Sequence, residues 1–562
     1  MKESKWFKEA IGYQIYPRSF KDSNNDGIGD IRGIISKLDY LSYLGVNLIW
    51  IGPIYKSPMD DNGYDVSDFY QIAEEYGTLN DVEELITEAH KRDIKIIFDL
   101  ILNHTSDEHP WFIESRKSKD NPYRDYYIWQ EGKNGGPPTN WASFFGGSCW
   151  NFDPQTNMYY MKIFSNKMPD LNWENKKFRD EMKKMIKWWL DKGIDGFRMD
   201  AIAHLAKDTS FSDGKVDKGY IYSGEWSKFS NRDELFIYLK ELKDDVFSKY
   251  DCVTIGEVGG GASTKDALRY SSYKNGSIDM VFTFDHCWEN GAFMSEHKKD
   301  EEIKTNVISL KKQFAKWQKL YNKSWNPLYW LNHDHPRVIS QYGDPINYFN
   351  ESAKMLAQTL HFMWGTPFIY QGEEIGMTNV DFNRIDQFKD TYIFDYAKDA
   401  KKRGLSEDQI INYLRRTSRV NARTPMQWDG SIYAGFSNTK PWIDVIGNYS
   451  YINVKNQIYD QNSILNHYRK LIEFRKDSEY KKTIIYGKFK LINMKHPQIF
   501  AYLRELDKKI IVLSNFTNEK TQFTIRNYQF RKLIISSYLD SPVINRKSYT
   551  LRPFESLVIE VE

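Results

Sequence analysis

The chain has 562 residues, 41% of them hydrophobic, and its 78 basic and 76 acidic residues leave a net charge of +2. A chain of this length is too long to fold around one compact hydrophobic core, so we expect two or three domains. The near-balance of charge excludes a polybasic surface for nucleic acid or an anionic membrane, so we expect a small neutral partner. Aromatic residues make up 16% of the chain; most must be core, although such rings also stack on sugars.

Cysteine usage and the apolar runs bear on location. Cys149, Cys252 and Cys287 form no CxxC pair and predict no disulfide framework. The opening residues, MKESKWFKEA, carry no apolar signal-peptide segment, and no run approaches the roughly 18 apolar residues of a membrane span. We therefore expect a cytoplasmic protein, a monomer or weak homo-oligomer, that binds neither nucleic acid nor membrane.

Short apolar runs alternate with amphipathic helical stretches through most of the chain, a pattern that predicts parallel strands covered by helices. The clearest helix is 177–190, which Gly193 is expected to close. The eight expected strands are residues 11–16, 47–51, 95–102, 196–200, 252–257, 279–284, 327–331 and 367–370.

Two segments break this rhythm. Residues 104–173 are rich in Gly, Pro, Asn and Trp with no clear helix, and a loop that long is functional or a small domain. After about residue 481, short strands alternate with turns, which predicts an antiparallel β-sandwich.

We predict an α/β protein: a (β/α)8 TIM barrel with a loop-rich subdomain inserted after the third strand and a C-terminal antiparallel β-sandwich domain. The expected bounds are 1–103 and 174–480 for the barrel, 104–173 for the insertion and 481–562 for the sandwich.

Charged and imidazole side chains stand at or just after the ends of four expected strands. They are Asp99, His104, Arg198, Asp200, Glu257, His333 and Asp334. Reactive residues of such barrels lie at the carboxyl ends of the strands. A single residue of this kind is most simply a surface or salt-bridged group, but four strands that all end in one indicate an active site.

This set suits the cleavage of a glycosidic bond. Retaining glycosidases use two carboxyl groups about 5–5.5 Å apart, one as nucleophile and one as acid and then base. The fourth and fifth strands are neighbours, so Asp200 and Glu257 can face each other. Arg198 lies two residues before Asp200 and points to the same side of its strand, where it would keep Asp200 ionised. Asp334 could then stabilise positive charge on the sugar ring.

Seven sequence blocks resemble those of the α-amylase superfamily, in its oligo-1,6-glucosidase and α-glucosidase branch. They are YQIYPRSF, DLILNHTS, MPDLNW, GFRMDAI, IGEVG, NHDHPR and ARTPMQW, and the resemblance covers essentially the whole chain. It implies that Asp200 is the nucleophile, Glu257 the acid/base and Asp334 the stabiliser of a retaining hydrolase.

The resemblance also implies a pocket for one glucose. An ion pair between Arg419 and Asp65 would close it and make the enzyme exo-acting. Phe164, near the rim, is a further candidate for substrate contact, although packing is the commoner role of such a residue. The expected substrate-binding residues are Tyr64, Asp65, His104, Phe164, Arg198, Ala201, His333 and Arg419.

The run DSNNDGIGD at residues 22–30 alternates oxygen-bearing side chains around a glycine, like the opening of an EF-hand loop. The pattern alone suits a solvated polar turn equally well. The resemblance implies a structural calcium, with magnesium as the alternative ion, and no organic cofactor. The expected ligands are Asp22, Asn24, Asp26, Asp30 and the backbone carbonyl of Ile28.

Some positions depart from the branch. Met168 and His335 stand where the branch usually has Gln, and Val420 stands where an Asp commonly follows the Arg, which puts substrate preference in doubt. The residue after Asp200 is Ala201. In the branch that the chain resembles, smaller residues or Thr at this position go with α-1,4 preference and Val with α-1,6, so the resemblance implies α-1,4 preference here. Because one or two methyl groups discriminate by only about 1–3 kcal/mol, the other linkage could persist.

We therefore predict a retaining, exo-acting α-glucosidase. It would release glucose from the non-reducing end of maltose and short malto-oligosaccharides through a covalent glucosyl-enzyme intermediate. An oligo-1,6-glucosidase (isomaltase), a sucrose or trehalose-6-phosphate hydrolase and a glucosyl transferase are the alternatives. A non-enzymatic transporter-associated homologue is disfavoured, because all three carboxylates are present and no membrane span is predicted.

Overall fold

The computed structural model describes residues 5–259, 261–540 and 548–562. The chain forms two compact units. The first comprises Met1–Ile49, Glu88–Ile94 and Phe284–Glu562, and the second comprises Trp50–Thr87 and Lys95–Thr283.

All eight expected strands are present, and they form one sheet in the order β11-β10-β9-β5-β2-β1-β13-β12. The pairs β5–β9, β9–β10 and β10–β11 of the second unit, and β1–β13 and β12–β13 of the first, are parallel. Nearly every strand residue is buried, as in parallel strands covered on both faces. The predicted (β/α)8 barrel is thus confirmed. The strands are β1 (Gly12–Ile15), β2 (Leu48–Ile51), β5 (Lys95–Ile101), β9 (Gly196–Asp200), β10 (Val253–Glu257), β11 (Met280–Phe282), β12 (Pro327–Leu328) and β13 (Thr366–Tyr370).

Helix α5 (Lys176–Asp191) shows how the sequence sets the helices of the second unit. The side chain of Asn175 accepts a hydrogen bond from the Phe178 amide and so caps the helix. One face is buried, and Gly193, at φ +97°, ends the helix as predicted. The unit also holds α4 (Pro110–Ser115), α6 (Asp233–Asp245) and α7 (Thr264–Ser271), while α3 (Leu79–His90) contributes residues to both units.

The expected insertion, residues 104–173, contains little regular structure apart from α4 and a small sheet. That sheet has the order β6-β8-β7 and is antiparallel. Trp150 of this sheet, Met161 of this sheet and Trp141 are buried together in a separate hydrophobic cluster. The short strands of the second unit are β4 (Asp68–Ile72), which pairs with β3 (Tyr55–Lys56), and β6 (Trp129–Gln130), β7 (Trp150–Asp153) and β8 (Met158–Met161).

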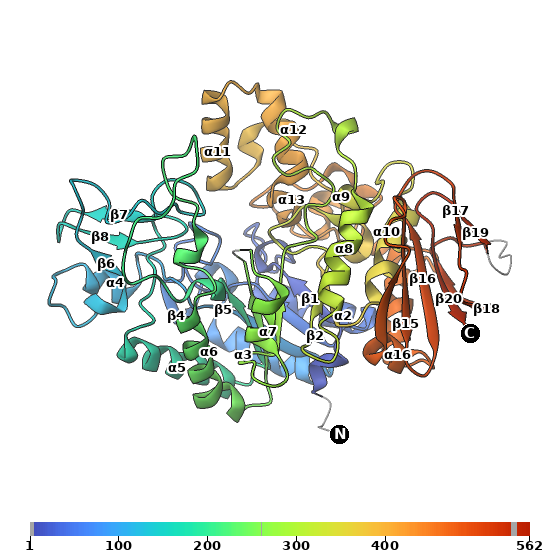
Figure 1. Ribbon diagram of the computed structural model, residues 1–562, viewed down its shortest axis with the longest axis horizontal. Coiled ribbons are helices and arrows are strands. Elements are labelled where there is room, and N and C mark those ends of the chain that lie inside the picture. Colours follow the sequence, from blue (N-terminus) through green and yellow to red (C-terminus); the bar gives the residue numbers. More distant parts are fainter. Residues whose placement is uncertain (1–4, 260, 541–547) are drawn as a thin grey trace. The chain divides into compact units, whose positions relative to one another are not determined.

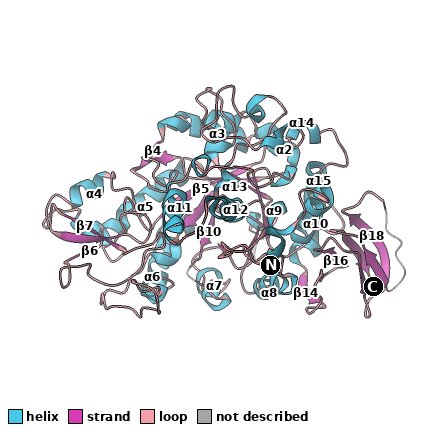
Figure 2. Ribbon diagram, turned by 90° about the horizontal axis from the view of Figure 1, so that it is seen from above, coloured by secondary structure: helices cyan, strands magenta, loops and turns pink. Residues whose placement is uncertain are grey.

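The first unit contains most of the helices and all of the C-terminal strands. In α10, every residue from 352 to 361 is buried. Figures 1 and 2 both show α10 beside β16, and Thr359 Oγ1 donates to Ser514 Oγ at 2.7 Å there. The helices are α1 (Ile31–Ile35), α2 (Leu38–Leu44), α8 (Val307–Gln318), α9 (Val338–Tyr342), α10 (Phe349–His361), α11 (Thr391–Lys402), α12 (Glu407–Thr417), α13 (Val420–Arg423), α14 (Val454–Gln457), α15 (Ile464–Lys476) and α16 (Lys481–Tyr486).

The C-terminal strands form antiparallel sheets, drawn in red in Figure 1. Five strands take the order β14-β15-β16-β20-β18, and β17 pairs with β19. The inward side chains alternate, with Ile499, Ala501 and Leu503 of β15 in one buried cluster. A helix, α16, occupies the start of the expected sandwich range, and β19 escaped prediction. The strands are β14 (Lys488–Ile492), β15 (Ile499–Glu505), β16 (Lys509–Asn515), β17 (Thr521–Thr524), β18 (Phe530–Ser536), β19 (Ser548–Leu551) and β20 (Ser556–Val561). Among the described residues, no helix is long and apolar enough to cross a membrane.

Candidate active site

Three neighbouring strands of the second unit bring carboxyl groups onto one arginine. Asp99 of β5 pairs in register with Arg198 of β9, and Gly256 of β10 pairs with Met199, so the next residues along these two strands are Glu257 and Asp200. Arg198 Nη1 donates to Asp99 Oδ1 at 2.6 Å and to Asp200 Oδ1 at 2.7 Å. Its Nη2 donates to the carboxylate of Glu257. The two predicted reactive carboxyl groups therefore meet on one guanidinium.

Burial decides the ionisation of this cluster. It raises the pKa of Asp200 well above its ordinary range; Arg198 opposes the rise, and the charge of Glu257 adds to it. Burial likewise raises the pKa of Asp99 to about 6, against the pull of Arg198. Three carboxylates and one guanidinium cannot all stay charged in a dry site.

Arg198 brings the carboxyl groups of Asp200 and Glu257 together, since both bind the same guanidinium. A retaining glycosidase starts with one ionised and one protonated carboxyl group. The paired carboxyl groups that this chemistry requires are present, and the raised pKa falls on Asp200, the residue predicted to be the nucleophile.

Tyr64 and Asp65, both predicted for the sugar pocket, lie in the second unit. Tyr64 Oη donates to Asp99 Oδ2 at 3.3 Å, and the Trp50 indole donates to the same oxygen at 3.0 Å. Asp65 is fully buried, and its Oδ1 accepts from Ser57 Oγ at 3.0 Å. Backbone amides bind the Asp65 carboxylate too, but burial still raises its pKa to about 6.

The rings of His104 and Phe164 pack edge to face, with their centroids 5.3 Å apart. His104 is buried, which lowers its pKa to about 3, so the ring is neutral near pH 7. Its Nε2 has no hydrogen-bond partner among the described residues. A neutral imidazole with an unused ring nitrogen suits a contact with a sugar hydroxyl.

Behind His104 lies a buried lysine that the sequence reasoning missed. Lys207 Nζ donates to Asn103 Oδ1 at 2.7 Å, to the His204 carbonyl at 2.6 Å and to Asp170 Oδ2 at 2.9 Å. Asp170 belongs to the MPDLNW block, which was the available signal, but nothing in that block points to Lys207. The lysine neutralises Asp170 and holds Asn103, the residue that precedes His104.

Ala201, the residue expected to influence linkage, has left-handed backbone angles, φ 47° and ψ 30°. It is 6% exposed and directly follows Asp200. A β-branched residue is a genuine outlier in this conformation, whereas alanine bears it at modest cost. The backbone at this position therefore favours a small side chain.

Asp334 lies in the first unit with two arginines and a histidine around it. Arg423 Nη2 binds its Oδ1 at 2.7 Å, Arg419 Nη1 lies 3.8 Å from the same oxygen, and His333 Nε2 lies 3.2 Å from Oδ2. Burial works against ionisation of Asp334, but His333, Arg423 and Arg419 together hold its pKa well below the ordinary range. Asp334 thus carries the negative charge expected of a stabiliser.

Arg419 also binds a carboxylate that was not foreseen. Its Nε donates to Asp390 Oδ2 at 2.6 Å and its Nη2 to Asp390 Oδ1 at 3.2 Å. The predicted pair of Arg419 with Asp65 joins residues of different units and stays a prediction. The predicted approach of Asp334 to the Asp200–Glu257 pair also joins residues of different units, so it too stays a prediction.

The expected calcium loop is held by its own hydrogen bonds. Asp22 Oδ1 accepts from the amides of Asn24 and Asn25 at 3.0 and 2.7 Å, and its Oδ2 accepts from Ser437 Oγ at 2.5 Å. Asp26 Oδ1 accepts from the Ile28 amide at 2.8 Å, and Asp30 binds Ser23 and Gly33. Within the described residues, no three His, Cys, Asp or Glu side chains gather in a way that could hold a metal. The calcium site stays a prediction.

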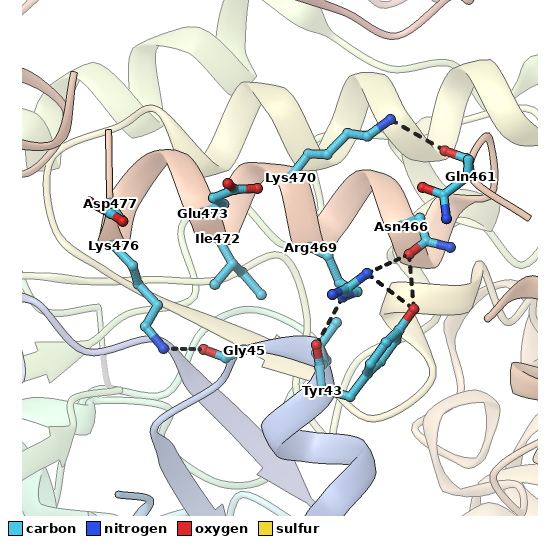
Figure 3. Close-up of a pocket in the computed structure, with 11 residues that line it drawn as sticks. Tyr43, Gly45, Gln461, Asn466, Arg469, Lys470, Ile472, Glu473, Lys476 and Asp477 are labelled. Carbon is cyan, nitrogen blue, oxygen red and sulfur yellow. Dashed lines mark hydrogen bonds between the residues drawn. The ribbon is translucent and has the colours of Figure 1, made fainter. Parts of the chain in front are cut away.

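A surface cavity of about 390 Å³ in the first unit lies between α2 and α15 (Figure 3). Arg469 donates to the Tyr43 carbonyl at 2.9 Å and stacks on the Tyr43 ring, and Lys476 donates to the Gly45 carbonyl at 3.2 Å. These cations satisfy carbonyls at the end of α2. None of the predicted site residues lines the cavity, and we assign it no part in the chemistry.

A (β/α)8 barrel with paired carboxyl groups at the ends of neighbouring strands is the framework of a glycoside hydrolase. Comparison with known proteins agrees. Residues 14–486 match the alpha-amylase catalytic domain. The chain belongs to the alpha-amylase family, as the sequence blocks predicted, and is a glycoside hydrolase.

Individual relatives are similar over their full length. An oligo-1,6-glucosidase of Bacillus cereus is 47% identical, with 100% of each chain covered. The crystal structure of trehalose-6-phosphate hydrolase from Bacillus licheniformis has a TM-score of 0.92 and 42% identity over 99% of this chain and 100% of that one. The structure of isomaltulose synthase from Klebsiella sp. LX3 has a TM-score of 0.93 and 36% identity over 100% of both.

Proposed function

We propose that this glycoside hydrolase releases glucose from short α-glucosides and prefers α-1,6-linked ones, isomaltose and its longer homologues. The observation that carries the reaction is the Asp200–Glu257 pair held on Arg198 at the ends of two adjacent strands. Asp200 attacks the anomeric carbon, and Glu257 protonates the leaving oxygen and then activates water. Asp334 stabilises positive charge on the ring.

The linkage preference departs from the prediction based on Ala201. The 47% identity to an oligo-1,6-glucosidase over the whole chain supports α-1,6 preference, while the preference for maltose has no such support. The left-handed backbone at Ala201 supplies a local reason for a small residue there. Its size therefore need not report the linkage.

Two other activities come from relatives of the same fold: trehalose-6-phosphate hydrolysis and formation of isomaltulose, for which a related synthase has sucrose as its natural substrate. A phosphorylated substrate requires a cationic cluster free to bind phosphate. The arginines placed beside Asp334, Arg419 and Arg423, are already bound to carboxylates. We therefore rank trehalose-6-phosphate hydrolysis below hydrolysis of α-1,6-glucosides. Isomaltulose formation ranks below it as well, because the identity to the synthase is 36% against 47% for the oligo-1,6-glucosidase.

The test is kcat/KM for isomaltose, maltose, trehalose, trehalose 6-phosphate and sucrose, with the first product anomer read by NMR. We expect isomaltose to exceed maltose by about tenfold or more and α-glucose to appear first. Faster hydrolysis of maltose would restore the prediction made from Ala201, and β-glucose as first product would contradict retention. Conversion of sucrose to an isomer without hydrolysis would favour the transferase alternative. Location in the cytoplasm and a monomeric or weakly oligomeric state stay predictions for fractionation and light scattering.

A further inference from the structure

Aromatic rings of the first unit form a series of contacts that begins at the residue after Asp334. The ring of His335 packs against those of Phe284 and Trp288, with centroids 5.4 and 5.6 Å away. Trp288 packs in turn against Phe293, at 5.2 Å. His335 is buried, Phe284 and Trp288 are half-buried, and Phe293 is 50% exposed. This aromatic row, Phe284, His335, Trp288 and Phe293, therefore leads from a buried histidine to the surface.

Two polar atoms of the row have no hydrogen-bond partner among the described residues. Asn332 Oδ1 lies 2.8 Å from His335 Nδ1 and also accepts from the Asp334 amide at 2.8 Å. An oxygen can only accept, so Nδ1 carries the proton of the ring and Nε2 is left as an acceptor. No described residue hydrogen-bonds Nε2 or the indole N–H of Trp288, and both atoms keep access to solvent.

The imidazole keeps this acceptor near neutral pH. Burial lowers the pKa of His335 to about 4, although the charge of Asp334 opposes the fall. The ring is therefore neutral at pH 7. Packing alone accounts for the rings, but it gives no role to an unused acceptor and an unused donor beside an aromatic face. A sugar uses both features, because its hydroxyl groups form hydrogen bonds and its C–H face packs on aromatic rings.

The position of the row narrows the sugar to one part of the substrate. His335 follows Asp334, whose side chain is 37% exposed and is proposed to stabilise the transferred glucosyl ring. The partners expected for that ring include no member of the row. The sugar that leaves is the part of a disaccharide without an assigned partner. The branch usually has Gln where this chain has His335, so the imidazole distinguishes this chain.

We propose that Trp288 and His335 bind the leaving sugar of the substrate. The indole packs on the C–H face of that sugar, and His335 Nε2 accepts a hydrogen bond from one of its hydroxyl groups. The proposal rests on the proposed function for the reaction and for the role of Asp334.

The test compares two substrates that donate the same glucosyl group. Isomaltose releases a sugar, whereas α-glucosyl fluoride releases fluoride, which has no ring to bind. His335→Phe keeps an aromatic ring and removes Nε2, and Trp288→Ala removes the indole. We expect each variant to lose about tenfold in kcat/KM for isomaltose, while kcat/KM for the fluoride stays within about threefold of the wild-type value.

Two further variants serve as controls. His335→Gln supplies a new acceptor and should recover most of the loss seen in His335→Phe. Tyr459→Ala removes a ring of the first unit that is 87% exposed, and it should leave both substrates unaffected. Circular dichroism checks the fold of each variant. If Trp288→Ala does not fold, the comparison of His335→Phe with His335→Gln decides the question.

The result against the proposal is an equal loss for both substrates, because the row would then act on glucosyl transfer or on the fold. Isomaltose hydrolysis within about twofold of wild type in the folded variants would overturn it as well. If the wild-type protein prefers maltose, the linkage in the proposed function fails, and maltose replaces isomaltose in the same comparison. Wild-type protein that hydrolyses the fluoride but no disaccharide would overturn this proposal and leave the glucosyl transfer standing.

Discussion

Glu373 follows β13 in the first unit and is 4% exposed. Its Oε1 accepts from Tyr468 Oη at 2.8 Å and its Oε2 from the Tyr370 amide at 3.4 Å. Burial raises the pKa of this carboxyl from 4.5 to about 8, although both donors favour the charged form. At pH 7 the folded protein therefore holds a proton here that the unfolded chain has released.

The sign of the effect on stability follows from proton binding. Between pH 4.5 and 8 the folded state binds more protons at Glu373 than the unfolded state does, so the free energy of unfolding falls as pH rises. Each pH unit inside that window costs up to about 1.4 kcal/mol, and the whole window about 5 kcal/mol. The stability is fully present below pH 4.5 and is lost by the time pH passes 8.

Glu373→Gln removes this titration while keeping the shape of the side chain. The difference in free energy of unfolding, variant minus wild type, should rise by about 3 kcal/mol between pH 5.5 and 7.5. Urea unfolding at pH 5.5, 6.5 and 7.5, followed by circular dichroism, measures the difference. Tyr468→Phe removes a donor that favours the charged form and should extend the decline of stability above pH 8. A variant-minus-wild-type difference that stays flat with pH would refute the reasoning.

Three further outcomes are expected. Asp200→Asn should lower turnover of isomaltose by about 10⁴-fold with an unchanged circular dichroism spectrum, and near-normal activity would remove the nucleophile assignment. Ala201→Val should lose about 1–2 kcal/mol of stability, because a β-branched residue resists the left-handed backbone; an unfolding midpoint equal to that of Ala201→Gly would contradict this strain. Calcium at 100 times its dissociation constant should add about 2.7 kcal/mol of stability that EDTA removes, and Asp26→Ala should abolish the gain; melting that ignores both additions would leave the loop a hydrogen-bonded turn.

The strands were predictable because one physical signal defined them. Parallel strands covered on both faces appear as short apolar runs, and β9 (Gly196–Asp200) has the bounds expected from the sequence alone. Their carboxyl ends were predictable for the same reason, since a strand fixes the side to which each residue points. Arg198 and Asp200, two residues apart, do share a side and a hydrogen bond. By contrast, α11 and α12 lie in a polar stretch of the sequence. Apolar strands and helices do not alternate there, so no pattern predicted these two helices.

Ion pairs between distant segments could not be predicted. Lys207 and Asp170 are 37 positions apart, and Asp390 and Arg419 are 29 apart, so no local spacing reveals either pair. Charge composition does not reveal them either, because the chain carries 154 residues of these types, 78 basic and 76 acidic. Only the fold selects which of them lose water together. The calcium loop shows the reverse case, in which a local pattern is clear but suits both a metal and a hydrogen-bonded turn.

The contacts of Arg198 in the structure give it a different role from the one that the sequence predicted. A guanidinium two residues before Asp200 was expected to keep that carboxylate ionised, yet the pKa of Asp200 lies above its ordinary range. The reason is that Arg198 is shared: it also binds Asp99 and Glu257, so its charge is divided among three carboxyl groups, while burial raises the pKa of both Asp99 and Asp200. One cation cannot neutralise three buried anions, and the surplus is relieved by protons. Arg198 therefore gathers the carboxyl groups without holding Asp200 ionised, which is the role that the sequence alone had assigned to it.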